Sequence, residues 1–249
     1  MVAFHSGKER VVAVRGIDFT LASGEAVAIV GESGSGKSVT ALALTQLLPN
    51  SASVCGRVLY RDHDLLSLSR RQIRSYRGKE IAYIFQEAGA ALNPVFSIGD
   101  QIGEAIRLHD PRVKEVKQRV IELLNQVGIE DPAARSRAYP HQLSGGMQQR
   151  SMIAMALACR PHLLIADEPT TALDVTTQRQ LIDLLTQLRQ ELGMAILFIT
   201  HNLGIVPRFA DRTLVMSQGQ IVEEGAVEEV LHSPKHPYTR TLLACMPRI

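Results

Sequence analysis

The sequence predicts an α/β fold with a mostly parallel sheet. Three short apolar runs lead to this prediction: "AVAIV" (26–30), "LLIAD" (163–167) and "AILFIT" (195–200). Each has the length of a strand and almost no polar residue, which is typical of strands buried on both faces. A helix between the last two runs is indicated by leucines at helical spacing, namely Leu181, Leu184, Leu185, Leu188 and Leu192. Buried strands joined through a helix form a parallel sheet.

Further elements follow from the same patterns. A helix is expected over 38–48, directly after the first apolar run. Residues 111–129 carry an apolar stripe at helical spacing among charges, and little between residues 90 and 160 has the pattern of a buried strand. We therefore interpret roughly 90–155 as a helical insertion. The stretch "TLVMSQGQIVEEG" (213–225) predicts two short strands around a Gln-Gly turn, as a peripheral hairpin.

Composition excludes several classes of protein. The chain has 249 residues, of which 45% are hydrophobic and 21% charged, so it can bury a substantial core. The net charge of +2 gives no general affinity for polyanions, and the basic run over 70–79 is interpreted as a solvated face. The three cysteines are scattered and lack a CxxC spacing, which argues against a disulfide framework and a zinc site: Cys55, Cys159 and Cys245.

The apolar runs also bear on location. They are too short to span a bilayer, and the N-terminus shows no basic-then-apolar signal segment. We expect a cytosolic chain whose association with a membrane comes through partners.

The stretch "GESGSGKS" (31–38) matches the phosphate-binding pattern GxxxxGK[ST], with an apolar strand before it and a helix after it. The glycines let backbone N–H groups surround phosphates, and the helix adds its positive N-terminal end. Lys37 is expected to reach the β- and γ-phosphates, and the Ser38 hydroxyl to ligate Mg²⁺. The complete expected loop is Gly31, Glu32, Ser33, Gly34, Ser35, Gly36, Lys37, Ser38 and Val39.

An acidic pair ends the second apolar run. Asp167 lies at the strand end where α/β proteins bind ligands, and we expect it to hold Mg²⁺ through water. Glu168 is then placed to orient and activate the attacking water as general base. Alone, such a pair is equally consistent with the N-cap of a following helix; the phosphate loop favours catalysis.

Two further polar residues follow strands. His201 comes directly after the third run and is positioned to contact the γ-phosphate and to hold the water and Glu168 in register. Gln86 follows a fourth apolar run, in "IAYIFQE", and enters the helical insertion. Its amide can meet Mg²⁺ and the attacking water.

The motifs "GESGSGKS", Gln86, "LSGGMQQR", "LLIADEP", "ALD" (172–174) and His201 occur in the order found in ATP-binding-cassette (ABC) ATPases, and this resemblance covers essentially the whole chain. It implies a P-loop NTPase core over 1–89 and 156–249, with antiparallel β elements. Residues 90–155 would form a helical subdomain that carries the signature loop.

The resemblance also explains why the chain has a second polar glycine loop. In the family, loops like this one bind the γ-phosphate of ATP held by the other subunit. Ser144, Gly145 and Gly146 would therefore serve a nucleotide on a partner molecule, and Asp174 would cross the same interface. Met147 stands where the family often has glutamine.

Within the family, the chain most resembles the ATPases of oligopeptide, dipeptide, glutathione and nickel importers. The terminal "HPYT" (236–239) is the most discriminating stretch. After Gln86 those relatives read Glu-Pro, whereas this chain has "EAGAALNP" (87–94), a segment that faces the permease in the family. Phe4 is the residue expected to stack on adenine. The sequence ends at Ile249, and we interpret it as a truncated chain, as half of a fused double ATPase or as a naturally short form.

The resemblance implies an ATP- and Mg²⁺-dependent motor subunit of a bacterial importer for peptides or similar small solutes. It would form a homodimer or heterodimer with a second ABC ATPase beneath two permeases on the cytoplasmic face of the inner membrane, served by a periplasmic solute-binding protein, with no nucleic acid. The alternative is a cytosolic ATPase subunit of a carbon–phosphorus lyase complex. A ribosome-bound translation factor ranks third, because such chains join two cassettes through a linker.

Overall fold

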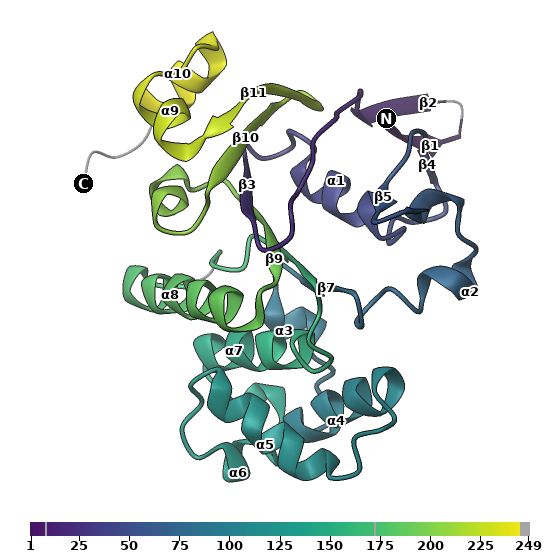
Figure 1. Ribbon diagram of the computed structural model, residues 1–249, viewed down its shortest axis with the longest axis vertical. Helices are drawn as coiled ribbons and strands as arrows, with labels where there is room; N and C mark the ends of the chain where they lie inside the picture. Colours follow the sequence, from purple (N-terminus) through teal and green to yellow (C-terminus); the bar gives the residue numbers. More distant parts are fainter. Residues whose placement is uncertain (8, 172, 245–249) are drawn as a thin grey trace. The chain divides into compact units, whose positions relative to one another are not determined.

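The computed structural model describes residues 1–7, 9–171 and 173–244. The chain divides into two compact units. The first combines Met1–Ile73 with Ala195–Ile249, and the second is Arg74–Met194. Figure 1 shows their elements.

The first unit is built around the strand β3 (Ala26–Val30), which is buried along its whole length. It pairs in parallel with β9 (Ala195–Thr200) on one side and with β10 (Arg212–Ser217) on the other. The strand β11 (Gln220–Ala226) pairs antiparallel with β10. The four strands lie side by side in Figure 1. The strands expected at 26–30 and 195–200 are thus confirmed.

The expected peripheral hairpin is only half correct. The two strands and their turn are present, with Gln218 (φ +47°) and Gly219 (φ +77°) in the left-handed conformation that two-residue hairpin turns favour. However, β10 is a buried strand beside β3, not a peripheral one. The reason lies in its continuous apolar run Leu214–Met216, which is covered on both faces.

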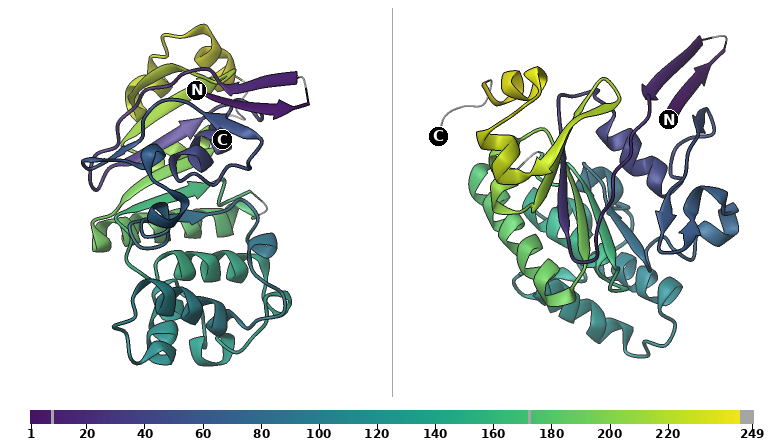
Figure 2. Two further views of the ribbon diagram at one scale, coloured as in Figure 1. Left: turned by 90° about the vertical axis from the view of Figure 1, so that its right-hand side faces the viewer. Right: turned by 45° about the horizontal axis from the view of Figure 1, so that its top comes forward.

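A separate antiparallel sheet has the order β2 (Glu9–Val14), β1 (Val2–Ser6), β4 (Ala52–Val54), and Figure 2 shows its first two strands as neighbours in both views. The helix α1 (Lys37–Leu44) ends earlier than expected, and Gln46 adopts a positive φ of 53° two residues after its end. The remaining elements of this unit are β5 (Leu59–Tyr60), β6 (His63–Asp64), η1 (Leu65–Ser67), α2 (Arg70–Ile73), η3 (Leu203–Arg208), α9 (Val227–His232) and α10 (Pro237–Ala244).

Part of the core of this unit lies under its C-terminal helices. A buried cluster joins β3, η3, β10 and α9, and residues of α10 pack against it. Its buried members are Ala28, Val30, Leu203, Val206, Val215, Val227 and Val230, with the partly buried Tyr238, Leu242 and Leu243 against them. The end of β3 and the start of α10 therefore share one apolar core.

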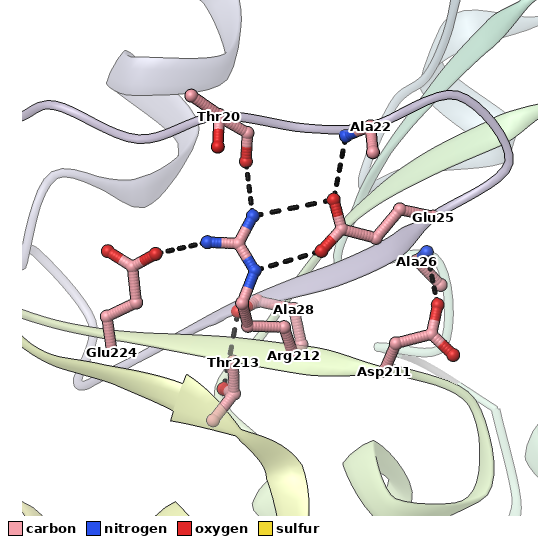
Figure 3. A network of polar contacts seen from close by, with 9 residues as sticks. All are labelled: Thr20, Ala22, Glu25, Ala26, Ala28, Asp211, Arg212, Thr213 and Glu224. Carbon is pink, nitrogen blue, oxygen red and sulfur yellow. Dashed lines mark hydrogen bonds and ion pairs between the residues drawn. The ribbon is translucent and has the colours of Figure 1, made fainter.

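A polar network around Arg212 fixes the segment that leads into β3 (Figure 3). The Arg212 guanidinium donates to both carboxylate oxygens of Glu25, at 2.9 and 3.4 Å, and also reaches the Thr20 carbonyl and Glu224. Glu25 in turn accepts the Ala22 amide at 2.7 Å. Burial raises the pKa of Glu25, but the hydrogen bonds from Arg212 and Ala22 outweigh it, and the pKa is lowered overall.

Replacing Arg212 by Met should lower the free energy of unfolding by about 2 kcal/mol at pH 7, because the Glu25 carboxylate loses its charged partner. The stabilisation should be full above pH 4.5, the ordinary value for Glu25, and should vanish as the pH falls through the lowered pKa of the folded state. Denaturant unfolding of both proteins between pH 3 and 7 tests this. Arg112→Met, which removes an ion pair on an 88% exposed side chain, is the control and should change nothing measurable. Equal midpoints for Arg212→Met and the parent chain at pH 7 would refute the prediction.

The second unit contains a parallel pair of strands and a group of helices. The strand β7 (Ile81–Ile84) pairs in parallel with β8 (Leu163–Asp167), as the apolar runs indicated. In the described part of 90–160 there is no strand, as expected. The helices are α3 (Ala88–Ala91), α4 (Ile98–His109), α5 (Val116–Gln126), α6 (Pro132–Arg135), η2 (Pro140–Gln142), α7 (Gly145–Ala156) and α8 (Val175–Leu192).

Three of these helices surround a common core. The helices α4, α5 and α7 pack on one another, and α7 also contacts β7. The helix expected within 111–129 spans only Val116–Gln126, because the chain leaves it at Gly128 with φ +72°. The helix α4 lies within the helical insertion expected over roughly 90–155, although no separate helix was predicted at its position. Among the described residues, every helix is too short or too polar to cross a membrane.

Candidate functional site

The phosphate loop begins at Gly31, immediately after β3, and two of its glycines, Gly31 and Gly36, are required by close backbone contacts. A Cβ on Gly31 would lie 2.1 Å from the Met216 carbonyl oxygen, and Gly31 has φ +154°. A Cβ on Gly36 would lie 2.8 Å from the Ala13 carbonyl oxygen, at φ +103°. The loop therefore passes closer to β10 and β2 than any side chain allows.

Lys37 is buried inside this loop, with only 4% of its surface exposed. Its ammonium donates to the carbonyl oxygens of Gly31 and Glu32, both at 2.8 Å, and lies 3.4 Å from the Ser35 hydroxyl. The helix α1 starts at Lys37, so Ser38 and Val39 lie in its first turn, where backbone N–H groups lack partners within the helix. A buried cation beside a helix N-terminus fits an anion of high charge.

The β10–β11 turn holds the loop from outside. The Gly219 amide donates to the Ser35 carbonyl at 2.9 Å, and the Gly219 carbonyl accepts the Arg15 amide at 2.8 Å. The turn thereby ties the loop to the end of β2. Glu32, Ser33 and Gly34 form the exposed side of the loop.

His201 follows β9 at the same sheet edge as the phosphate loop. Val30 pairs with Thr200 in the parallel register of β3 and β9, so Gly31 and His201 each come directly after a paired residue. His201 is exposed there. This edge is formed by the carboxyl ends of parallel strands, where α/β proteins bind ligands.

The second unit brings its own polar residues to the ends of its parallel strands. Ile84 pairs with Ala166, and Asp167 is the next residue of β8. Asp167 is only 5% exposed, and its carboxylate accepts a 2.8 Å hydrogen bond from the Tyr83 hydroxyl. Burial and the charge of Asp167 raise the pKa of Tyr83 far above its ordinary value, so this tyrosine remains a neutral donor. A carboxylate fixed in this way suits a hard cation such as Mg²⁺.

Glu168 has an unusual backbone conformation, with φ +46° in the left-handed region, which is uncommon for a residue with a side chain. Its carboxylate oxygen Oε2 accepts hydrogen bonds from the Gln86 amide at 3.3 Å and the Thr171 hydroxyl at 2.9 Å. Strain of this kind costs about 1–3 kcal/mol and is concentrated at functional sites. The alternative of a simple helix cap does not hold, because α8 begins at Val175 and Asp174 is its cap.

The motifs predict ATP hydrolysis with Glu168 as general base, so replacing Thr171 by Val is expected to lower ATP turnover about three- to tenfold, because Glu168 loses a hydrogen bond that orients its carboxylate. The KM for ATP should stay unchanged, since Thr171 lies outside the phosphate loop. Steady-state hydrolysis at varied ATP concentrations separates the two parameters. Thr176→Val, a change of the same shape in the exposed first turn of α8, is the control. Parent-like turnover in Thr171→Val would show that this contact does not matter.

The second glycine loop starts the helix α7. Ser144 caps the helix and accepts the Met147 amide at 3.3 Å, and both Ser144 and Gly145 are exposed. A Cβ on Gly146 would lie 3.1 Å from a methyl group of Thr177. The side-chain amide of Gln148 donates hydrogen bonds to the carbonyl oxygens of Pro140 and Leu143, at 2.8 and 3.3 Å. These bonds fix the segment that precedes the loop. The N-terminus of α7 is thus capped and exposed.

The other expected site residues have ordinary structural positions, in a helix cap and in a strand. Asp174 caps α8 by accepting the amides of Thr176 and Thr177, both at 3.0 Å, and the Thr177 hydroxyl at 2.6 Å. Hydrogen bonds from Thr177 lower the pKa of Asp174. Phe4 is half-buried in β1, opposite Val11 and Ala52. Ala172 of the "ALD" motif and Cys245 lie outside the described residues, whereas Cys55 and Cys159 are free thiols.

Sequence reasoning missed Tyr83, Thr171 and Tyr238. Tyr83 pairs with Ile165, so it shares a face with Ile165 and Asp167 in the alternation of the two strands. That relation needs the strand register, which the sequence does not carry. Thr171 follows Glu168 by three residues, and a hydroxyl at this spacing is a weak signal that could have been found.

A glycine loop that buries a lysine between a parallel strand and a helix is the arrangement of the P-loop nucleotide-binding proteins. The family model described as "ABC transporter" matches residues 14–171, more than half of the chain. The chain therefore belongs to the ABC transporter family. A second model, "Oligopeptide/dipeptide transporter, C-terminal region", matches residues 222–249.

Curated relatives include the peptidoglycan transport ATP-binding protein YejF of Agrobacterium fabrum, 55% identical over 99% of this chain and 46% of that protein. The glutathione import ATP-binding protein GsiA of Escherichia coli K12 is 50% identical over 100% of this chain and 41% of that protein. The chain thus spans less than half the length of these relatives.

Solved structures agree with this assignment. The ATP-binding cassette MJ0796, a dimer bound to ADP and Pi in a post-hydrolysis state, is 28% identical, with a TM-score of 0.79 over 91% of this chain and 99% of that chain. CbiO1 of Clostridium perfringens, part of the transporter complex cbiONQ, is 28% identical, with a TM-score of 0.76 over 93% of this chain and 90% of that chain. The expected ABC ATPase fold is confirmed.

Proposed function

We propose that the chain is the ATP-hydrolysing motor subunit of a bacterial ABC importer for peptides or similar small solutes, with glutathione among them. The observation that carries this proposal is the pairing, in one chain, of an ABC transporter match with the C-terminal region of oligopeptide and dipeptide transporters. The names of the relatives support it. They do not favour the alternative of a carbon–phosphorus lyase ATPase. Nickel remains a further solute class.

The buried Lys37 and the amides that open α1 suit the phosphates of ATP, with Gly31, Glu32, Ser33, Gly34, Ser35, Gly36 and Val39 shaping the loop. Phe4 would stack on the adenine. Ser38, Gln86 and Asp167 are oxygen donors fit to hold Mg²⁺, which when bound neutralises charge on the phosphates. The fixed, acceptor-only carboxylate of Asp167 supports this assignment.

Glu168 would accept the proton of the attacking water, with its carboxylate oriented by Gln86 and Thr171. His201 would contact the γ-phosphate and keep that water in place. The strained backbone of Glu168 and the strand-end position of His201 support these roles.

The signature loop would serve a second nucleotide, held by another ABC ATPase in a homodimer or heterodimer. The exposed N-terminus of α7 at Ser144, Gly145 and Gly146 supports this, because it offers backbone N–H groups to an outside anion. Asp174 would lie at the same interface. ATP binding would then close the pair and hydrolysis would release it.

Two permeases and a solute-binding protein would complete the importer, with this chain peripheral on the cytoplasmic face of the inner membrane. The segment after Gln86 is where a permease would dock. There, the apolar side chains of Val95 and Phe96 are 71% and 52% exposed. The side-chain amide of Gln101 accepts a hydrogen bond from the Asn93 amide at 2.8 Å and donates one to the Asn93 carbonyl at 3.0 Å. We propose that residues 90–155 transmit this contact as a helical subdomain.

An affinity purification tests the proposal. The tagged Glu168→Gln chain would be isolated from gently solubilised native cells with Mg-ATP, and its partners identified by mass spectrometry. We expect two polytopic permeases and a second ATPase. A soluble enzyme assembly without membrane proteins would overturn the transport function and leave the ATP chemistry standing.

A further inference from the structure

The "HPYT" stretch contacts the phosphate loop directly. The hydroxyl of Tyr238 accepts a hydrogen bond from the Glu32 amide at 3.1 Å, across 206 residues of sequence. The Tyr238 side chain also packs on the buried cluster that contains Val30, the last residue before the loop. Helix α10 lies beside the β10–β11 pair in Figure 1. The C-terminal region and the nucleotide loop are therefore in contact through both a polar and an apolar interaction.

The amide that Tyr238 holds belongs to the same peptide group that Lys37 holds. The Gly31 carbonyl accepts from the Lys37 ammonium at 2.8 Å, and the Glu32 N–H is the other polar group of that planar unit. In a trans peptide these two groups point in opposite directions. Lys37 and Tyr238 thus fix one peptide plane from both sides. Gly31 lacks a Cβ and adopts φ +154°, so these two hydrogen bonds restrain a peptide plane that follows a conformationally permissive residue.

Tyr238 is itself held firmly. The Glu223 carboxylate of β11 accepts the amides of Lys235 and His236 at 2.7 and 3.0 Å, and His236 Nδ1 accepts the Tyr238 amide at 3.2 Å. Burial raises the pKa of Glu223, but the amides of Lys235 and His236 help to outweigh it, and the pKa is lowered overall. Glu223 therefore stays charged at neutral pH and anchors the start of α10 to the sheet.

We propose that Tyr238 is a positioning residue for nucleotide binding, and that the C-terminal "HPYT" segment sets the geometry of the phosphate loop. This inference rests on the proposed function, in which Lys37 binds the phosphates of ATP; to do so, its ammonium has to leave the carbonyls of Gly31 and Glu32. Tyr238 keeps its hydrogen bond to the Glu32 amide during that step, so the peptide plane does not rotate when Lys37 releases it. The C-terminal region thereby contributes to ATP affinity without touching ATP.

The test is Tyr238→Phe, which removes the hydroxyl and keeps the ring in the apolar cluster. Titration of the isolated chain with Mg-ATP should show a Kd raised about two- to tenfold, the effect of one hydrogen bond. The melting temperature should stay within about 2–4 °C of the parent, the cost of one hydrogen bond in a chain of this size, since the packing is unchanged. Without nucleotide, hydrogen exchange at the Glu32 amide should become faster.

Two further variants make the test specific. Tyr60→Phe is the matched control and should leave the Kd unchanged, because the Tyr60 ring lies in β5, where Arg61 covers it at 5.4 Å. Glu223→Gln should raise the Kd for Mg-ATP through the same contact. The effects of the two changes should therefore not add: the Kd of the double variant with Tyr238→Phe should not exceed the higher of the two single-variant values.

The outcomes separate the two proposals. If the parent chain binds ATP and Tyr238→Phe has the same Kd and the same rate of hydrogen exchange at the Glu32 amide, this inference alone is overturned. A parent chain that binds no ATP overturns the proposed function, and the inference with it. A Kd raised together with a melting temperature lowered by well over about 4 °C, more than one hydrogen bond accounts for, would assign Tyr238 a general structural role and also overturn the inference.

Discussion

Replacing Glu168 by Gln should reduce ATP hydrolysis by about 10²- to 10⁴-fold, the usual contribution of a positioned general base. Glutamine keeps the shape of the side chain and can still accept hydrogen bonds from Gln86 and Thr171, but its amide cannot take a proton from water. Binding of Mg-ATP should remain, because the phosphate loop is untouched. Single-turnover hydrolysis and equilibrium titration measure the two effects separately.

Glu130→Gln is the control for this experiment, since it makes the same change on an exposed carboxylate of the same unit. It should hydrolyse ATP at the parent rate. Hydrolysis by Glu168→Gln at close to the parent rate would show that another group is the base, and the strained backbone at this position would then need a different explanation.

Replacing Gly31 by Ala should abolish Mg-ATP binding at concentrations that saturate the parent chain. The new Cβ would lie 2.1 Å from the Met216 carbonyl oxygen, which belongs to the buried strand β10 and cannot move away cheaply. We also expect the free energy of unfolding to fall by about 1–3 kcal/mol, because the backbone conformation at Gly31 is unfavourable for alanine. Nucleotide titration and denaturant unfolding measure the two changes.

Gly34→Ala separates strain from steric clash in the same loop. Gly34 also has a positive φ, of 81°, but an added Cβ there would meet nothing within 4 Å. This variant should lose some stability and keep a measurable affinity for Mg-ATP. If the two variants bind Mg-ATP equally well, the close approach of the loop to β10 is not what requires glycine at position 31.

The sequence predicted the main strands well because burial on both faces leaves a visible trace. The run "AVAIV" is buried at every position. The next residue is Gly31, and the conformation and close contacts of the loop explain why it is glycine. The same reasoning applied to Leu214–Met216 would have placed β10 inside the sheet, but the turn beside it suggested an isolated hairpin. The error shows that the continuous apolar pattern is the stronger of the two signals.

The helix α4 was predicted only as part of the helical insertion, for a physical reason. It contains Gly99 in its first turn and Gly103 in its interior, and glycine disfavours a helix by propensity. Tertiary packing overrides that preference, because a Cβ on Gly99 would lie 2.7 Å from the Ser136 carbonyl and one on Gly103 would lie 3.2 Å from Val116. The glycines allow close approach to neighbouring segments, while the buried Ile98, Ile102 and Ile106 form the apolar face.

In the candidate site, some residues can likewise be predicted from the sequence, whereas the side chains that hold them cannot. Motif spacing predicts the phosphate loop, and positions after apolar strands predict roles for Asp167 and Glu168, because these signals are local in the sequence. Gln86 was proposed from its company with these motifs. The side chains that hold them depend on strand register and on contacts over long sequence distances. Tyr83 reaches Asp167 across a parallel pair, and Tyr238 reaches Glu32 from the far end of the chain. Neither relation can be read from periodicity.

The most direct test of the central claim concerns the two glycine loops, which we propose serve two different nucleotides. The isolated Ser144→Arg chain would be titrated with Mg-ATP at concentrations where it is monomeric, beside the parent chain. We expect the same Kd for both, and we expect the added charge and bulk to prevent nucleotide-driven pairing in the Glu168→Gln background. Loss of ATP binding by the monomeric Ser144→Arg chain would contradict the claim, because the signature loop would then act on the nucleotide of its own chain.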